Sequence, residues 1–231
     1  MKVFAISDLH LCQNNSKPMN IFGPVWDNYL DKIILSWNEK VNEEDVVILA
    51  GDYSWAMKLD EVKPDFDFIK NLKGTKIIIR GNHDYWWKSI SAVRELLPPN
   101  TFALQNDAVK IGEYIFCGNR GWTIPEGKDN TIENRKLYER EVIRLKLSLD
   151  NAKSLQTNNE KIIFITHYPP FNNKQENSEY TKLLSEYKVY KVVFGHLHNY
   201  INPNMRHNNI DGVQYYLTSC DAVKNELVEI D

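Results

Sequence analysis

Residues 76–87 read KIIIRGNHDYWW. The run begins with the apolar stretch Ile77–Ile79 and passes directly into Asn82, His83 and Asp84. A short apolar run without alternation predicts a strand that is covered on both faces, as in layered α/β folds. Taken alone, the polar cluster after it is also compatible with a simple turn, because Gly, Asn and Asp favour turns. Polar clusters elsewhere in the chain are needed to tell whether residues 81–84 form a simple turn or part of a functional site.

Six further segments have the same character as this strand. Each is short, nearly continuous in apolar residues, and rich in Val, Ile or aromatic side chains, which predicts a buried strand. They are KVFAIS (2–7), DVVILAG (45–51), YIFCG (114–118), KIIFITH (161–167), KVVFGH (191–196) and VQYYLTS (213–219).

Two longer segments between these strands show helical periodicity. Apolar residues recur at helix spacing in residues 25–41, and along one stripe of a segment from about 133 to 155. Strands interleaved with helices are typical of an α/β fold, and 231 residues are enough for one large core. We therefore expect one α/β domain over residues 1–231. The stripe residues, which we expect in the core, are Trp26, Leu30, Ile33, Ile34, Trp37, Val41, Leu145, Leu149 and Ala152.

The composition excludes some classes of partner. The formal net charge is −3, whereas a sequence-independent grip on long nucleic acid needs clustered Lys and Arg. The three cysteines are odd in number and widely spaced, which favours reduced thiols and a cytoplasmic location. No signal peptide is predicted, and no apolar stretch approaches the roughly 20 residues of a membrane span. A small phosphorylated substrate remains compatible with this composition.

Polar residues follow five of the predicted strands at the point where each strand ends. In open α/β sheets, ligands bind beyond the carboxyl ends of the strands, so these segments are expected to meet at one place. Five of the six histidines lie in them. The clusters are Asp8-Leu9-His10, Gly51-Asp52, Gly81-Asn82-His83-Asp84, His167 and Gly195-His196-Leu197-His198.

The spacing within the clusters suits the binding of a single object. In an extended backbone, residues i and i+2 point to the same side. Asp8 and His10 are therefore expected to grasp one ligand together, as are His196 and His198, while the intervening leucines face apolar surroundings. Glycine brings the backbone close to a bound ion, and it stands beside the polar residues at Gly51, Gly81 and Gly195.

The residue types in the clusters are those of a metal site. Imidazole suits zinc, iron and nickel, and carboxylate or amide oxygen suits manganese. Each cluster alone is a weak signal, because Asp and His also cap helices and end strands. The whole set is too large for one tetrahedral site and fits two adjacent metals that share a carboxylate. The candidate ligands are Asp8, His10, Asp52, Asn82, His167, His196 and His198.

Read in order, the clusters resemble the signature of the calcineurin-like metallophosphoesterase superfamily, which is D-x-H, G-D, G-N-H-D/E, H and G-H-x-H. The resemblance runs from Asp8 to His198. The stretches FGPVW and GNHDYWW are similar to a bacterial branch of predicted phosphohydrolases. The resemblance implies a four-layer α/β/β/α sandwich of two mixed β-sheets flanked by helices, the metallo-dependent phosphatase fold.

The resemblance also implies a reaction. A hydroxide that bridges two metal ions would attack a phosphate mono- or diester in line. His83 would face the phosphate, as electrostatic stabiliser or as general acid, and Asp84 would orient His83. The metals would be Mn, Fe, Zn or Ni, and the ligand residues divide as follows: the first ion would be held by Asp8, His10 and His198, the second by Asn82, His167 and His196, and Asp52 would bridge both.

One position departs from the family pattern. Relatives often carry a second acid after G-D, where this chain has Trp55, and this puts hydrogen bonding around the ligands in doubt. Substrate specificity is expected in the loops around the strand ends, 12–25, 85–88, 120–134 and 168–180. Arg120 is a weak candidate for a phosphate clamp, with a surface salt bridge as the equal alternative. The aromatics Tyr85–Trp87 either stack on a base or aryl ester or, as we favour for Trp86 and Trp87, start a helix and fill the core.

Two other functions remain open. A non-catalytic, metal-containing protein-interaction module could share the fold, although the intact His83 favours an enzyme. Hydrolysis of a non-phosphate ester is the third option. The expected partner is a small phosphorylated molecule, such as a nucleotide, and the sequence does not fix an oligomeric state.

Overall fold

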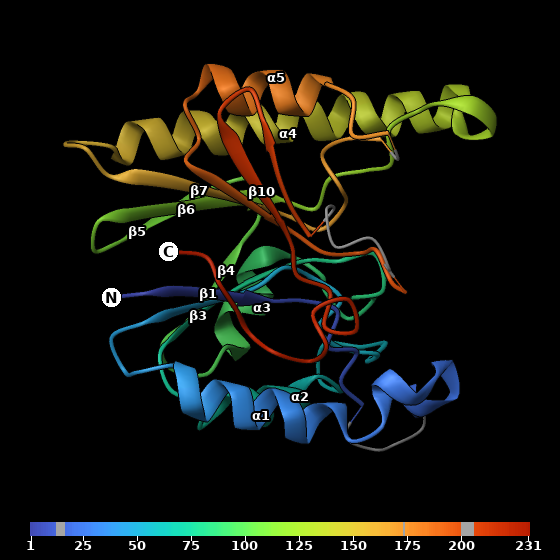
Figure 1. Ribbon diagram of the computed structural model, residues 1–231, viewed down its shortest axis with the longest axis vertical. Coiled ribbons are helices and arrows are strands. Elements are labelled where there is room, and N and C mark those ends of the chain that lie inside the picture. Colours follow the sequence, from blue (N-terminus) through green and yellow to red (C-terminus); the bar gives the residue numbers. More distant parts are fainter. Residues whose placement is uncertain (13–16, 173, 200–205) are drawn as a thin grey trace.

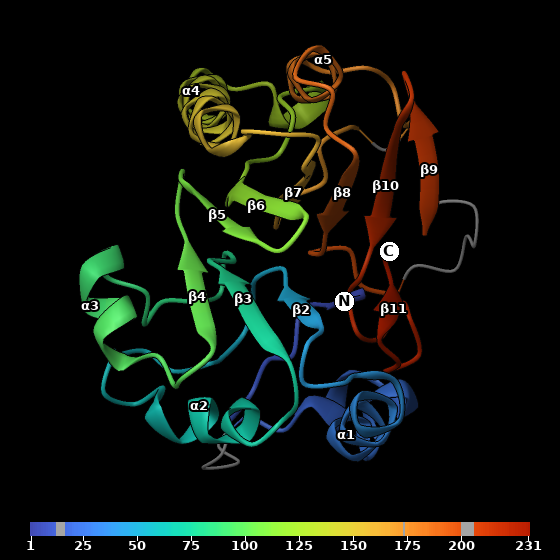
Figure 2. The same ribbon diagram turned by 90° about the vertical axis from the view of Figure 1, so that its left-hand side faces the viewer.

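The computed structural model describes residues 1–12, 17–172, 174–199 and 206–231. Two mixed sheets lie face to face, and helices cover the outer face of each (Figures 1 and 2). The first sheet has the order β11-β1-β2-β3-β4 and the second β5-β6-β7-β8-β10-β9. The strand bounds are β1 Val3–Ile6, β2 Val46–Leu49, β3 Thr75–Ile79, β4 Thr101–Leu104, β5 Ala108–Ile111, β6 Tyr114–Asn119, β7 Lys161–Thr166, β8 Lys191–Phe194, β9 His207–Ile210, β10 Val213–Leu217 and β11 Val228–Glu229.

Helices complete the outer layers, which confirms the predicted α/β/β/α sandwich. The first sheet carries α1, α2 and α3, and the second carries α4 and α5 (Figure 2). Within the described parts of the chain, no helix is both long and apolar enough to cross a membrane. The helix bounds are α1 Tyr29–Lys40, α2 Lys63–Lys70, α3 Ile90–Leu96, α4 Ile132–Leu155 and α5 Glu179–Glu186, with short 3-10 helices at Met19–Phe22, Pro24–Trp26 and Gly127–Asp129.

The strand β1 shows why the sequence has continuous apolar runs. Phe4 and Ile6 face the layer between the first sheet and its helices, whereas Val3 and Ala5 face the layer between the two sheets. Successive side chains of a strand point to opposite faces, and here both faces are buried. An alternating polar pattern would place polar atoms in one of these layers.

The carboxyl ends of the parallel strands carry the polar clusters that the sequence singles out. In the first sheet β1, β2, β3 and β4 are parallel, and in the second β6, β7, β8 and β10 are parallel. The antiparallel strands β11, β5 and β9 lie at sheet edges. The polar clusters after β1, β2, β3, β7 and β8 therefore come together from both sheets.

The structure corrects two helix predictions. The helix expected over residues 25–41 begins only at Tyr29, because Asn28 adopts a left-handed backbone with φ 52° that interrupts it. Trp86 and Trp87 fill the core as expected, with exposed fractions of 0% and 2%. They do not start a helix, however, since α3 begins at Ile90 after the N-cap Ser89.

Candidate metal centre

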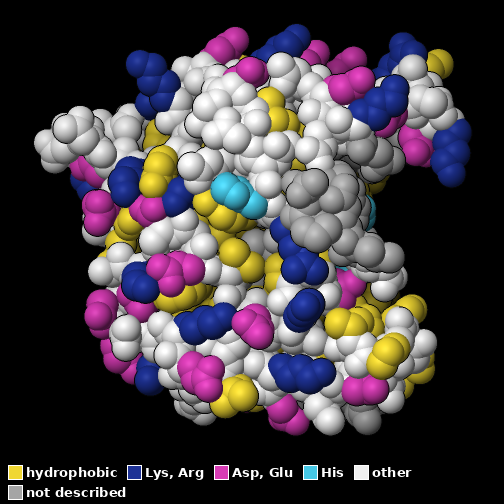
Figure 3. Space-filling view, in the orientation of Figure 1, with side chains coloured by type: hydrophobic (Ala, Val, Ile, Leu, Met, Phe, Trp, Pro, Cys, Tyr) yellow, Lys and Arg dark blue, Asp and Glu magenta, His cyan; other side chains and the backbone are white. Residues whose placement is uncertain are grey.

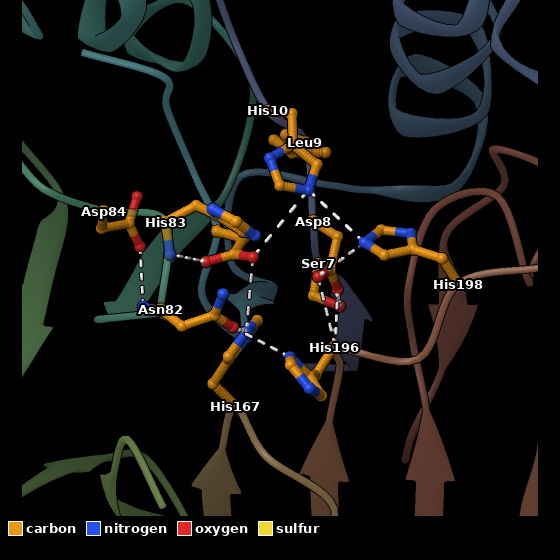
Figure 4. Close-up of polar contacts among 12 residues, drawn as sticks. Ser7, Asp8, Leu9, His10, Asn82, His83, Asp84, His167, His196 and His198 are labelled. Carbon is orange, nitrogen blue, oxygen red and sulfur yellow. Dashed lines mark hydrogen bonds and ion pairs between the residues drawn. The ribbon is translucent and has the colours of Figure 1, made fainter. Parts of the chain in front are cut away.

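Donor atoms from the ends of β1, β2 and β8 form a first group. Nε2 of His10 lies 3.4 Å from Nε2 of His198 and 3.9 Å from Oδ2 of Asp52. Nε2 of His198 lies 3.5 Å from Oδ1 of Asp8. Two imidazole nitrogens that face each other beside two carboxylates form an arrangement in which one cation can satisfy all of them. Figure 4 shows His10, Asp8 and His198 pointing toward one another.

A second group lies beside the first. Oδ1 of Asn82 is 2.8 Å from Nε2 of His167 and 2.8 Å from Nδ1 of His196. The ring nitrogen of His167 is also 3.4 Å from Oδ2 of Asp52, the same carboxylate oxygen that faces His10. One oxygen of Asp52 is thus shared by the two groups. The structure thus brings all seven predicted ligand residues together: six are labelled in Figure 4, and Asp52 is placed by its distances to His10 and His167.

The backbone at the ligand positions differs from the expectation. Asp8 and His10 were expected in an extended segment, but their φ angles are 59° and 47°, in the left-handed region. Asp52 and His196 share this conformation, with φ of 50° and 71°. Non-glycine residues adopt it at an energetic cost, and such residues cluster at functional sites. Left-handed turns, rather than extended spacing, direct these side chains inward.

Glycine is required at three positions for a specific reason. A Cβ atom at Gly81 would lie 2.1 Å from Oδ1 of Asp52, and one at Gly195 would lie 2.4 Å from Oδ2 of Asp8. A Cβ atom at Gly51 would lie 2.6 Å from Nδ1 of His167. The close approach predicted for glycine is therefore to the candidate ligands themselves.

The electrostatics of the site depend on burial and on Asp52. Burial lowers the pKa of His10 to about 4, against the opposing attraction of Asp52 and Asp8. Burial, and then the charge of His167, lower the pKa of His196 to about 4. Burial alone would lower the pKa of His167, but the Asp52 carboxylate outweighs it and raises this pKa to about 9. In the metal-free protein, a proton on His167 therefore partly neutralises Asp52.

His83 lies beside Asp52, and the Asp84 carboxylate makes hydrogen bonds other than one to the His83 ring. The backbone N–H of His83 donates to Oδ1 of Asp52 at 2.7 Å, and Nδ1 of its ring is buried without a hydrogen-bond partner among the described residues. Asp84 makes no hydrogen bond to that ring. Its carboxylate instead accepts from four other donors, the backbone N–H groups of Tyr53, Ser54 and Gly81 and the indole N–H of Trp86. Asp84 thus holds the loops that carry Asp52 and His83, through their backbones.

The order and geometry of these residues agree with a known protein family. The family model of the calcineurin-like phosphoesterases matches residues 1–200. The chain belongs to this family. Among curated proteins, no sequence matches this chain.

Solved structures of other proteins share the fold of this calcineurin-like phosphoesterase at low sequence identity. TT1561 of Thermus thermophilus is 15% identical with a TM-score of 0.61, over 98% of this chain and 96% of that one. AQ665 from Aquifex aeolicus, a protein of unknown function, is 12% identical with a TM-score of 0.51, over 99% and 95%. At these identities the likeness concerns the fold alone.

Trp55 takes the place of the second acid that other calcineurin-like phosphoesterases often carry. Its ring stacks on His10, with centroids 4.6 Å apart and planes 20° apart, and lies 4.8 Å from the ring of His83. Lys17 places Nζ 4.8 Å from the centre of the Trp55 ring. Stacking on Trp55 therefore restrains the orientation of the His10 imidazole.

Asp221 is a functional residue that sequence reasoning missed. Nδ1 of His198 donates to Oδ1 of Asp221 at 3.0 Å, and the backbone N–H of Asn199 donates to Oδ2 at 2.7 Å. A metal-binding histidine commonly donates its other ring nitrogen to a carboxylate in this way. His167 has an equivalent support, because its Nδ1 lies 3.0 Å from the carbonyl oxygen of Ala50. Asp221 follows the predicted strand 213–219. Its position after a strand, which it shares with the predicted ligands, could have identified it as a candidate site residue.

The expected substrate loops are partly described. Residues 13–16 and 173, within the loops 12–25 and 168–180, lie outside the described residues. Tyr85 is 45% exposed, with its ring 6.1 Å from that of His83. Arg120 makes neither hydrogen bond nor ion pair with its guanidinium among the described residues, and that group lies 4.9 Å from the ring of Trp122. Its carbonyl accepts the backbone N–H of His167 at 3.0 Å, so Arg120 borders the metal centre.

Proposed function

We propose that this chain is a metal-dependent phosphoesterase that hydrolyses phosphate mono- or diesters. The observation that carries the proposal is the shared position of Asp52, one oxygen of which faces His10 on one side and His167 on the other. Two carboxylates, an amide oxygen and four imidazoles around this point suit two divalent ions. The first ion would be held by Asp8, His10 and His198, the second by Asn82, His167 and His196, with Asp52 bridging them.

The protein environment fits such ions. Asp8 and Asp52 are almost completely buried, and buried carboxylates require nearby positive charge. The ring nitrogens of His10 and His198 that face each other at 3.4 Å are both oriented toward one point. When bound, metal ions at these positions supply positive charge for the phosphate oxygens and an acidified water as nucleophile.

His83 is the residue proposed to act on the leaving group. Its backbone is fixed by Asp52, and its ring lies between that of His10, 5.7 Å away, and that of the exposed Tyr85, 6.1 Å away. A protonated imidazole in this place can donate to the leaving oxygen of the ester, a role typically worth roughly 10² to 10⁴ in rate. An intact His83 favours an enzyme over a non-catalytic binding module.

Hydrolysis of model esters tests the proposal. Chelator-treated protein reloaded with Mn²⁺ is offered p-nitrophenyl phosphate and bis-p-nitrophenyl phosphate in parallel. We expect metal-dependent release of nitrophenol from at least one ester, and the preferred ester separates a monoesterase from a diesterase. Absence of turnover for both, in protein that verifiably holds two metals, would favour the binding module.

A further inference from the structure

A cavity of about 270 Å³ is lined by residues at the ends of β3, β4 and β6 and by residues of α4. It lies where the carboxyl ends of β3 and β6 approach α4, on the side of the molecule that carries β4 and β5 in Figure 2. Arg80 directly follows β3, and Arg120 directly follows β6. The charged residues that line it are Arg80, Lys88, Arg120, Arg140, Arg144 and Glu141.

The charge of this cavity contrasts with the rest of the chain. Its lining has five basic side chains and one carboxylate, in a protein whose formal net charge is −3. Figure 3 shows a face on which Lys and Arg side chains are interspersed with Asp and Glu side chains. The cavity therefore concentrates positive charge that the overall composition does not predict.

Most of these cations have no side-chain hydrogen bond or ion pair within the described parts of the chain. Arg144 is paired with Glu141 at 2.5 Å. Arg80 makes no ion pair or hydrogen bond with its side chain, and its Nε is buried without an acceptor. A buried donor that is left unsatisfied destabilises the folded protein. The side chains of Lys88, Arg120 and Arg140 are likewise without a described hydrogen bond or ion pair.

Like charges face one another across the cavity. Arg80, Arg120 and Arg144 line the same small volume, and the buried carboxylates of Asp84 and Glu141 attract Arg80 against this repulsion. Both of these carboxylates are already occupied: Asp84 accepts four hydrogen bonds, and Glu141 accepts from Asn119 and Arg144. An anion from outside the chain would relieve this repulsion and satisfy the free donors.

We propose that this cavity binds a phosphate group other than the one that reacts at the metal centre. Guanidinium groups present forked N–H donors that match the oxygens of phosphate in pairs. The cavity is small, which suits a phosphate or diphosphate group. Several arginines directed at one such volume provide both the charge and the donors that the group requires.

The position of the cavity links this anion to the metal centre. Arg80 stands two residues before Asn82, and the carbonyl of Arg120 accepts the backbone N–H of His167. The phosphate group has two possible sources, a second phosphate on the substrate or a free inorganic anion. Binding of a second phosphate on the substrate rests on the proposed function. Binding of a free inorganic anion does not.

Calorimetric titration of inorganic pyrophosphate into the chelator-treated full chain tests the site. The test variant combines Lys88→Gln with Arg140→Gln, since both side chains are exposed and unpaired among the described residues and their loss should leave the fold intact. Lys146→Gln is the matched control, because Lys146 is exposed on the same helix as Arg140 and does not line the cavity. Thermal unfolding confirms that all the proteins are folded.

We expect the double variant to bind pyrophosphate at least about tenfold more weakly, because it loses two charge-assisted contacts. The control should bind within about twofold of the unmodified chain, because a distant surface charge is screened by salt. No measurable binding by the unmodified chain, or equal binding by the double variant, would overturn the proposal.

A kinetic arm separates the two sources of phosphate. The metal-loaded chain and the double variant are compared with an ester that carries one phosphate and a nucleoside bisphosphate that carries two. A rise in KM that is confined to the bisphosphate assigns the cavity to the substrate. Unchanged KM values together with weakened pyrophosphate binding assign it to a free anion. Inactivity toward both esters would contradict the proposed function, and the calorimetric result would still decide the anion site.

Discussion

Nδ1 of His198 donates a hydrogen bond to Oδ1 of Asp221 over 3.0 Å, and this bond turns Nε2 of the same ring toward Asp8 and His10. Asp221 accepts a second hydrogen bond from the backbone N–H of Asn199. The carboxylate therefore fixes both the tautomer and the orientation of a candidate metal ligand without touching the metal position itself.

Replacement of Asp221 tests this positioning role. Asp221→Ala should weaken metal binding by about 10- to 100-fold, as expected when the carboxylate behind a metal-binding histidine is removed. The measurement is competition with a chelator of known affinity, using Asp60→Ala, a change at an exposed turn, as the control. An Asp221→Ala protein that binds both metals as tightly as the control would show that His198 needs no such support.

Removal of the His83 imidazole should separate chemistry from metal binding. His83→Ala should lower turnover by roughly 10² to 10⁴ while leaving the metal content nearly intact, because the side chain serves the leaving group and not the ions. Metal analysis and steady-state kinetics on the same preparation give both numbers, and His207→Ala, on an exposed strand, is the control. Loss of both metals would instead identify His83 as a ligand or structural residue.

The stacking of Trp55 on His10 should strengthen binding of the metal that His10 holds. Trp55→Leu should weaken binding of the metal held by His10 by roughly 3- to 10-fold, the value of an aromatic pair beyond simple burial. Trp55→Phe keeps an aromatic face over the imidazole and should restore most of the affinity. Equal affinities for the Leu and Phe variants would mean that Trp55 merely fills space.

The hydrogen bonds of Asp231, a residue outside the candidate metal centre, should make the stability of the protein depend on pH. Burial would raise the pKa of this carboxyl, but hydrogen bonds from Lys161, Lys191, Tyr114 and Tyr190 outweigh it and hold the pKa well below its usual range. A carboxyl whose pKa is lower in the folded state stabilises the protein above its unfolded pKa, and this contribution is lost as the pH falls. Asp231→Asn should therefore lower the free energy of unfolding at pH 7 by about 1 kcal/mol, because solvent screens the interactions of this partly exposed carboxylate.

The same variant should differ less from the unmodified chain below about pH 4, where the carboxylate of the unfolded chain becomes protonated. Urea unfolding at pH 7, 5 and 3 measures the two proteins side by side. A difference that stays constant across these pH values would show that the charge of Asp231 is not involved.

The elements predicted best are those with the strongest sequence pattern. The seven short apolar runs all contain strands, because a nearly continuous apolar run suits a strand in the interior of a layered fold. β4, β5, β9 and β11 were not predicted, since they are short and their side chains are partly exposed. The short helices α2, α3 and α5 were also missed, because two turns of helix give little periodic signal.

The candidate site was predictable in its residues and not in its geometry. All seven predicted ligands meet, because they follow parallel strands whose carboxyl ends lie together. No local sequence pattern encodes the left-handed backbone of Asp8 and Asp52 or the close packing of their carboxylates against Gly195 and Gly81. The hydrogen-bond partners of Asp84 could not be predicted for a similar reason, because a buried carboxylate accepts from the backbone donors that the fold brings close to it.

The most direct test of the account is the dependence of turnover on metal stoichiometry. Chelator-treated protein is titrated with Mn²⁺ while hydrolysis of the preferred nitrophenyl ester is followed, with Asp52→Asn in parallel. We expect full activity only at two equivalents of Mn²⁺ per chain, and we expect Asp52→Asn to bind both ions weakly and to hydrolyse little ester. Full turnover without metal, or a variant that keeps two ions and full rate, would contradict a centre built on the shared Asp52 carboxylate.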